Sequence, residues 1–152
     1  PQEIYDTPAN IFVATFMGSP AMNVVPGKVV VKDGRPHADV ATDGGMATLP
    51  FSQDNLAAWD GREILLGIRP ETITDQDGAD RKSSNIATFQ APVIVTEPAG
   101  SDTFVSTQLG GKGAVARMRS DTAIAAGDNF NFAVNMEKAV AFDPKTEARI
   151  AP

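Results

Sequence analysis

Hydrophobic and polar residues alternate with a period of two along most of the chain after Asn23. The clearest example lies near the end, where Phe130, Phe132 and Val134 share one face and three asparagines share the other. Successive side chains of a strand point to opposite faces of a sheet, which explains this spacing. We therefore expect a strand over residues 129–135.

The same alternation predicts further short strands, separated by turns rich in glycine and aspartate. Their expected ranges are 24–31, 36–41, 46–50, 63–68, 89–95, 102–109, 113–119 and 138–142. Turns such as Lys32-Asp33-Gly34 and Gly110-Gly111 suit hairpins, because glycine adopts positive φ without steric cost. About nine or ten short antiparallel strands predict a mainly β domain, built as a barrel or a sandwich.

Helical signals are confined to the first residues. Thr7 is a suitable N-cap, and Pro8 fits the first helical position because no N–H is needed there. The apolar residues that follow recur at helical spacing: Ile11, Phe12, Phe16 and Met17. Gly18 can end such a helix in the left-handed conformation. The pattern predicts one helix from Pro8 to Met17.

Composition narrows the class of protein. Hydrophobic residues make up 42% of the 152 residues, which is typical of a globular domain. A net charge of −6 argues against a nucleic-acid partner or a basic membrane patch. With no cysteine, disulfides and thiol chemistry are excluded. No apolar run approaches the roughly 20 residues that span a bilayer, so we expect no direct membrane insertion.

A nucleotide-binding P-loop is missing from the sequence. Such a loop reads G-x-x-x-x-G-K-[ST], so that backbone amides surround the phosphates while lysine and a hydroxyl complete the site. Gly27-Lys28 and Gly111-Lys112 lack both the hydroxyl residue and the glycine five places upstream. We expect no catalytic residue and no ATP or magnesium site here. The start at Pro1, without Met or a signal peptide, suggests a piece of a longer protein.

Two other candidate sites fail on their spacing. His37, the only histidine, stands between Pro36 and Ala38 without a recognisable nucleophile, which favours an exposed histidine at a strand end. The acidic run that begins at Asp75 and includes Asp77 resembles a calcium loop, but it lacks the glycine and the glutamate that an EF-hand requires. We expect no metal site, and we interpret residues 75–85 as a solvated loop between two halves of the β domain.

Three stretches, in their order and spacing, carry a family resemblance. They are residues 1–14 with the Phe16-Met17-Gly18-Ser19-Pro20-Ala21-Met22-Asn23 run, Gly67-Ile68-Arg69-Pro70-Glu71, and Glu97-Pro98-Ala99-Gly100-Ser101-Asp102-Thr103. With them the chain resembles the C-terminal third of the ATP-binding subunit of bacterial carbohydrate-import ABC transporters, the maltose and glycerol-phosphate importer group. Residues 142–146 also match the closing motif of that family, with Glu147 standing where glycine is common.

The resemblance implies a fold, a division of the chain and a role. It implies an OB-like transport-associated β domain at 19–152, with residues 1–18 left over from the nucleotide-binding domain. The implied role is a non-catalytic regulatory and dimerisation domain, whose parent subunit uses ATP and magnesium to power import of a sugar or related solute. If residues 1–18 belong to another domain, their removal should leave the β domain folded with little change in melting temperature.

Implied partners are a second copy of the chain, its own ATPase domain, the permease subunits reached through that domain, and cytosolic regulators. The implied location is cytoplasmic, peripheral on the inner face of the cell membrane through the transporter complex. The expected interface and regulatory residues are Ser19, Pro20, Met22, Asn23, Gly67, Ile68, Arg69, Pro70, Glu71, Glu97, Pro98, Gly100, Ser101, Asp102 and Thr103. Arg69 has an alternative interpretation, in which it pairs with a carboxylate or a turn carbonyl and fixes the exit of the 63–68 strand.

One alternative function remains open, a stand-alone module of the same fold that binds a small ligand or an oxyanion. Molybdate-binding relatives of this fold share a Ser-Ala-Arg-Asn-type run that supplies hydrogen-bond donors. No such run occurs here, and the excess of acidic residues disfavours an anion pocket. A chain with its own start codon, or a ligand that copurifies with it, would favour this alternative.

Overall fold

The computed structural model describes residues 2–18, 20–79 and 83–152. Two short helices, α1 (Gln2–Asp6) and α2 (Ile11–Phe16), precede the β strands. The helix predicted from Pro8 to Met17 is present as α2, but its predicted start and its predicted N-cap, Thr7, are wrong. Asn10 is the N-cap, and its side chain accepts a hydrogen bond from the Val13 N–H at 2.9 Å. Asn10 is extended, and its neighbour Ala9 accepts a hydrogen bond from the Arg149 N–H, because the backbone here pairs with the C-terminal segment.

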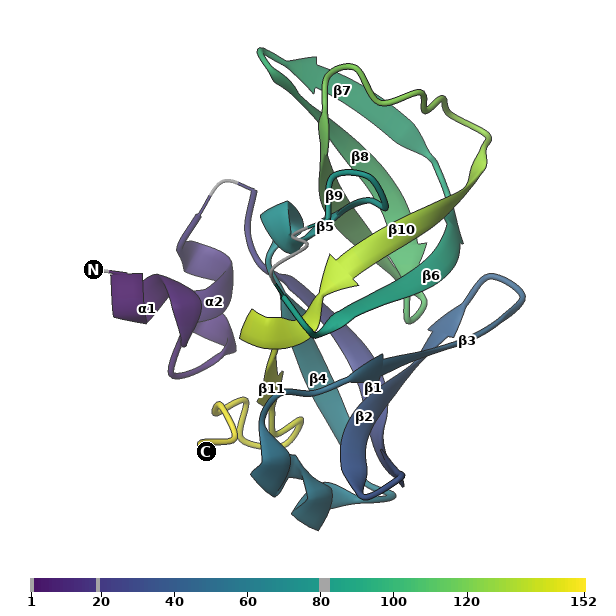
Figure 1. Cartoon of the computed structure of the whole chain (residues 1–152). Helices are drawn as coiled ribbons and strands as arrows, with labels where there is room; N and C mark the ends of the chain where they lie inside the picture. The colour runs from purple at the N-terminus through teal and green to yellow at the C-terminus, as the bar shows by residue number, and fades with distance from the viewer. Residues whose placement is uncertain (1, 19, 80–82) are drawn as a thin grey trace.

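The first half of the β region is a five-stranded antiparallel sheet in the order β11-β4-β1-β2-β3 (Figure 1). Its strands are β1 (Asn23–Lys32), β2 (Arg35–Thr42), β3 (Gly45–Pro50), β4 (Glu63–Ile68) and β11 (Val140–Phe142). A 3-10 helix, Asp54–Trp59, connects β3 to β4. The bounds of β4 agree with the prediction from alternation. Strand β11 begins two residues later than predicted, because a 3-10 turn occupies Met136–Lys138.

The second half contains two three-stranded sheets, β5-β10-β6 and β7-β8-β9. Their strands are β5 (Ile73–Asp75), β6 (Ile86–Pro92), β7 (Val95–Ala99), β8 (Asp102–Leu109), β9 (Lys112–Arg119) and β10 (Asn129–Asn135). The 3-10 turn Pro70–Thr72 connects β4 to β5. Figure 1 shows this half above the five-stranded sheet, to which the chain returns through β11. The mainly β, OB-like fold class is confirmed, with eleven strands in the described residues.

The predicted strand over 89–95 is wrong in its second part. Strand β6 ends at Pro92, and the next two residues turn the chain into β7. The Val93 N–H donates to the carbonyl of Asp128 at 2.8 Å, and the Ile94 N–H donates to Ser106 at 2.8 Å. Val93 is buried while Val95 is 51% exposed, so these two side chains do not share the predicted face. Hydrophobic and polar residues keep alternating through the bend between β6 and β7, so the sequence pattern gives no sign of the bend.

One hydrophobic core joins the two halves of the β region. It includes large buried side chains from both, among them Phe51, Leu66, Met118 and Phe132. A second, smaller cluster joins α2 to the first sheet and consists of Ala14, Met22, Val140 and Phe142. Asn23 connects β1 to β9 with its side chain, which donates to the carbonyl of Val115 at 2.9 Å and accepts from its N–H at 2.8 Å.

The stretch predicted as a solvated loop, 75–85, has buried ends. Asp75 is 7% exposed and Asn85 is 4% exposed. Asn85 donates to the carbonyl of Pro50 and to the hydroxyl of Ser52, and it accepts from Arg35. These two polar residues therefore hold the ends of the connection against the β region, which corrects the prediction for them. Asp80, a further member of the acidic run that begins at Asp75, lies outside the described residues.

Candidate functional site

Arg69 follows β4 directly and is 5% exposed. Its guanidinium donates three hydrogen bonds to backbone carbonyls of the N-terminal segment. One terminal nitrogen, Nη1, reaches Ala14 O at 3.2 Å and Met17 O at 2.7 Å. The other, Nη2, reaches Tyr5 O at 2.7 Å. Both helices are thus attached to the exit of β4 through one side chain.

The acceptors of Arg69 explain why an arginine suits this position. The last carbonyls of a helix have no partner inside the helix, and here they come from the ends of α1 and α2. Guanidinium offers five N–H donors in a planar fork, so a single residue can serve carbonyls of both helices. The alternative interpretation, in which Arg69 pairs with a carboxylate or a turn carbonyl, is wrong about the partners. The acceptors are backbone carbonyls of the two helices and of Met17, which lie 52–64 residues away in the sequence.

Tyr5 and Glu71 complete this group, which we call the Arg69 cluster (Tyr5, Arg69 and Glu71). The guanidinium carbon lies 3.9 Å from the centre of the Tyr5 ring, close enough for a cation–π contact. The Tyr5 hydroxyl donates to the Glu71 carboxylate. Burial, with the hydrogen bond and charge of Glu71, raises the pKa of Tyr5 to about 12, so the phenol stays protonated near neutral pH. Beside the cluster, Lys138 and Asp6 form an ion pair at 3.5 Å.

Gly67 allows the first sheet to approach this region closely. A Cβ atom at this position would lie 2.6 Å from Met22 Sδ, 2.8 Å from Phe142 Cε2 and 2.9 Å from Val140 Cγ2. Any side chain there would push apart the second hydrophobic cluster, which carries α2. Gly67 leaves room for the contact between α2 and the first sheet, and Arg69 stabilises the same contact by hydrogen bonds.

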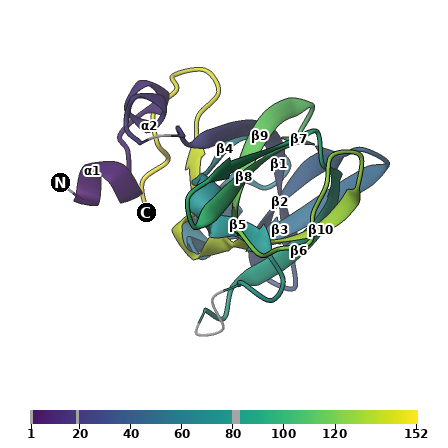
Figure 2. The ribbon, with the colours of Figure 1, turned by 90° about the horizontal axis from the view of Figure 1, so that it is seen from above.

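The C-terminal segment supports the N-terminal segment from another side. The Ile11 N–H donates to Glu147 O at 3.1 Å, and the Arg149 N–H donates to Ala9 O at 2.8 Å. Figures 1 and 2 both place the C-terminal segment beside the two helices. Glu147 has a φ of 62°, which explains the glycine that the family resemblance leads us to expect there.

Comparisons with known proteins agree with this architecture. Residues 18–73 match the family described as "MalK OB fold domain", and residues 66–142 match the "TOBE domain". The chain belongs to the TOBE domain family. Together the two matches cover residues 18–142, and the resemblance to the domains of this family is confirmed. The two matches meet at residues 66–73, the stretch that holds Gly67 and the Arg69 turn.

Three curated relatives of this TOBE chain are named as ATP-binding proteins of import or transport systems. The oligosaccharides import ATP-binding protein MsmX of Bacillus subtilis is 33% identical over 159 residues, covering 99% of this chain and 40% of that protein. The multiple sugar-binding transport ATP-binding protein MsmK of Streptococcus mutans is 35% identical, covering 99% and 39%. The sn-glycerol-3-phosphate import ATP-binding protein UgpC of Yersinia pestis is 34% identical, covering 100% and 39%. The chain spans about two-fifths of the length of these relatives.

A solved structure shows the same fold. The cytoplasmic molybdate-binding protein ModG, crystallised with molybdate, has a TM-score of 0.53 and covers 80% of this chain and 96% of its own. Its sequence is 18% identical to this TOBE chain, so the likeness shows the fold alone.

The predicted interface residues fall into separate places. Within 67–71 only Glu71 is exposed. Arg69 is covered by the N-terminal segment, whereas Ile68 belongs to the main hydrophobic core. In the hinge, Met22 and Asn23 are buried and Pro20 is half-buried, while Ser19 lies outside the described residues. The Glu97–Thr103 stretch forms the β7–β8 hairpin, with residues 97–101 exposed. No hydrogen bond or ion pair joins this hairpin to the Arg69 turn among the residues that the structure describes. Their interface role stays a prediction.

Sequence reasoning missed Tyr5, Asp6 and Lys138 as neighbours of the Arg69 turn. Tyr5 and Glu71, for example, are 66 residues apart in the sequence, and no spacing pattern in the sequence indicates that such a pair is in contact. The described residues contain no group of three side chains that could hold a metal ion. No helix in the described part of the chain is long and apolar enough to cross a membrane.

Proposed function

We propose that this chain is the regulatory and dimerisation domain of the ATP-binding subunit of an importer for a sugar or related solute. The family membership and the importer relatives support this role. The strongest structural support for this role is that Arg69 attaches both N-terminal helices to the β region. In the relatives, the matched region is about two-fifths of a longer ATP-binding protein.

The proposed mechanism is mechanical. Two ATPase domains that separate and rejoin in each cycle need a second contact that keeps their effective concentration high while they are apart. A β domain with a self-complementary face provides a two-fold contact of that kind. Arg69, Gly67 and the C-terminal segment hold the N-terminal helices in one orientation, so a preceding domain would follow the movement of the β region. Cytosolic regulators that bind the β region would then bias the open or closed arrangement.

We expect this chain to form a homodimer. Exposed apolar side chains support this, including Ile94 at 45% and Val95 at 51% exposure beside the β7 edge. Leu65, in contrast, is partly buried against the second hydrophobic cluster. A lasting dimer needs roughly 1,200 Å² of buried surface. Sedimentation across a wide concentration range measures the state, and a clean monomer at ~100 μM, well above typical micromolar constants, would contradict the proposal for this chain.

A pair of variants locates the contact. Ile94→Asp should shift the equilibrium toward monomer if the β7 edge lies in the dimer interface, because a buried carboxylate without a partner is strongly unfavourable. Met46→Asp is the matched control, since Met46 is 61% exposed and lies on β3 in the other half of the β region. If only Met46→Asp dissociates the dimer, the interface lies on the first sheet.

We expect the chain to bind no magnesium-ATP. The missing P-loop motivates this, and neither short helix offers the glycine-rich entry that holds phosphates. Isothermal titration calorimetry with magnesium-ATP should show no saturable heat. A micromolar site would contradict the non-catalytic role. The genomic sequence upstream of Pro1 provides an independent test, because an ATPase in the same reading frame supports the proposal and a start codon at this point opposes it.

A further inference from the structure

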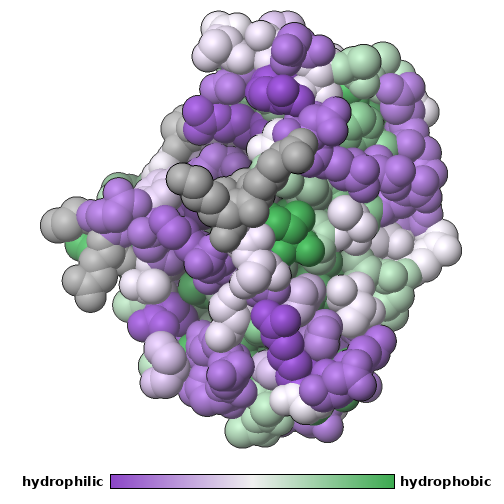
Figure 3. Space-filling view, viewed as in Figure 1, coloured by the Kyte–Doolittle hydropathy of each residue, from purple (hydrophilic) through white to green (hydrophobic). Residues whose placement is uncertain are grey.

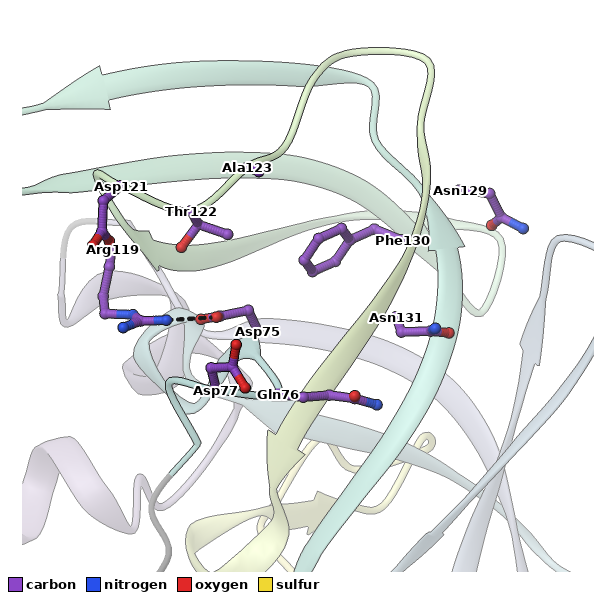
Figure 4. A pocket seen from close by; sticks show the side chains of 10 residues that line it. All are labelled: Asp75, Gln76, Asp77, Arg119, Asp121, Thr122, Ala123, Asn129, Phe130 and Asn131. Atoms are coloured by element: carbon purple, nitrogen blue, oxygen red, sulfur yellow. Dashed lines mark hydrogen bonds and ion pairs between the residues drawn. The ribbon is translucent and has the colours of Figure 1, made fainter.

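A polar pocket of about 480 Å³ opens in the second half of the β region (Figure 4). Its lining comes from the ends of β5, β9 and β10 and from the loop after β9. The lining residues are Asp75, Gln76, Asp77, Arg119, Asp121, Thr122, Ala123, Asn129, Phe130 and Asn131. Pockets that hold small molecules measure roughly 300–1,000 Å³, so its size suits a ligand.

The pocket exists because β5 is shorter than its neighbour. Strand β10 pairs with β6 along its whole length, from Asn129 to Asn135. It pairs with β5 only from Phe132 to Val134, because β5 ends at Asp75. Residues 129–131 thus lack a strand partner on the β5 side. The open edge of β10 and the loop after β9 form two walls of the hollow.

One ion pair holds the floor of the pocket in place. Arg119 Nη2 lies 2.7 Å from Asp75 Oδ2, and the Asp75 side chain is 10% exposed. The hydrogen bond and the charge of Asp75 raise the pKa of Arg119, so it remains a cation. Only one of its nitrogens contacts the carboxylate, so other N–H donors of the guanidinium remain available to a ligand.

Several polar groups at the pocket have no partner within the described part of the chain. The side-chain amides of Gln76 and Asn131 form no hydrogen bond there. The hydroxyl oxygen of Thr122 is buried and also unpaired among the described residues. Figure 4 shows this hydroxyl and the Phe130 ring on one side of β10, whereas the Asn131 side chain points to the other side of the strand, at the rim of the pocket. The Phe130 ring is fixed by an edge contact with Phe132 at 5.0 Å between centroids.

We propose that this pocket binds a neutral polyhydroxylated compound, a sugar or a polyol. Carboxylates only accept hydrogen bonds, guanidinium only donates them, and amides and hydroxyls do both. A ligand hydroxyl also donates and accepts, so it can use every kind of group present. The Phe130 ring offers an apolar face beside these polar groups. This inference goes beyond the proposed dimerisation role, which needs no ligand.

The charged side chains that line the pocket disfavour two other classes of ligand, oxyanions and organic ammonium ions. Three carboxylates, those of Asp75, Asp77 and Asp121, surround a single guanidinium, which disfavours an oxyanion such as molybdate. An organic ammonium ion carries only donors, so it would leave the free N–H groups of Arg119 and of the amides without acceptors. A hydroxylated neutral molecule meets neither difficulty.

NMR titration of the ¹⁵N-labelled chain tests the inference. Maltose and sorbitol are the probes, each raised to about 10 mM, ten times a millimolar dissociation constant. We expect saturable shifts of the backbone amides of residues 75–77, 119–123 and 129–131. Molybdate and spermidine, at the same concentration, should leave these amides unchanged. No saturable shift with either hydroxylated probe, or a response to molybdate or spermidine alone, would overturn the proposal.

Two matched variants make the test specific. The double variant Gln76→Ala and Asn131→Ala removes the two unpaired amides, both on exposed residues. We expect it to weaken binding of the responding probe roughly tenfold, since two hydrogen bonds are lost. Gln108→Ala, an exposed glutamine of β8 outside the pocket, should leave binding unchanged. Equal affinity in the double variant would overturn the assignment of the pocket. Sedimentation measures dimerisation independently of ligand binding. The ligand proposal and the dimer proposal can therefore be contradicted separately.

Discussion

Replacing Arg69 by alanine should lower the free energy of unfolding by roughly 2–4 kcal/mol, because three buried or partly buried hydrogen bonds from a charged group are lost together. The carbonyls of Tyr5, Ala14 and Met17 would lose their donor. Tyr5 would also lose the cation above its ring. In a chain of this size the change corresponds to a fall in melting temperature of roughly 4–15 °C. Chemical denaturation followed by circular dichroism measures the free energy of unfolding, and a thermal scan measures the melting temperature.

Arg69→Lys separates charge from geometry. Lysine keeps the positive charge but has no planar fork, so it cannot serve acceptors in both helices and lie flat on Tyr5. We expect this variant to recover less than half of the lost stability. Arg117→Ala is the control, because Arg117 forms a surface ion pair with Asp102 and such pairs contribute about 1 kcal/mol or less. If Arg69→Ala is as mild as Arg117→Ala, the Arg69 cluster does not hold the helices.

Strand prediction succeeded where alternation and glycine turns act together. The predicted bounds of β4 and β8 agree with the structure. Those of β3 and β9 differ by one residue at one end, and those of β1 and β2 by one residue at each end. In these strands one face is buried and the connecting turns are short, so local sequence determines the register. The corner after Pro92 was missed because Val93 and Ile94 hydrogen-bond to distant residues while the hydrophobic alternation continues.

The candidate site was harder to predict, for a related reason. The acceptors of Arg69 are backbone carbonyls, which every residue carries, so the sequence holds no sign of which ones it contacts. The helix start was also misplaced, because the backbone of residues 9 and 10 pairs with the C-terminal segment. The open edge of β10 depends on where β5 ends, and Asp75 looked like part of a solvated loop. Long-range pairing decides these features, and local pattern does not.

Deletion of residues 1–18 should destabilise the β region, although the sequence led us to expect little change. The second hydrophobic cluster would lose Ala14 and expose Met22, Val140 and Phe142. Arg69 would remain beside the first sheet without its three carbonyl acceptors. We expect a loss at least as large as that of Arg69→Ala, roughly 3–5 kcal/mol. A melting temperature within about 2 °C of the full chain would restore the earlier expectation.

Combining the two changes shows whether they act on one contact. Residues that share partners do not contribute additively, and the difference from additivity measures their coupling. In the chain without residues 1–18, Arg69 has no acceptor from the helices, so Arg69→Met should be neutral or stabilising there. In the full chain the same substitution should be clearly destabilising. Four melting curves complete the cycle. Equal losses in both backgrounds would mean that Arg69 stabilises the β region by itself, and that the N-terminal segment is held by the C-terminal segment alone.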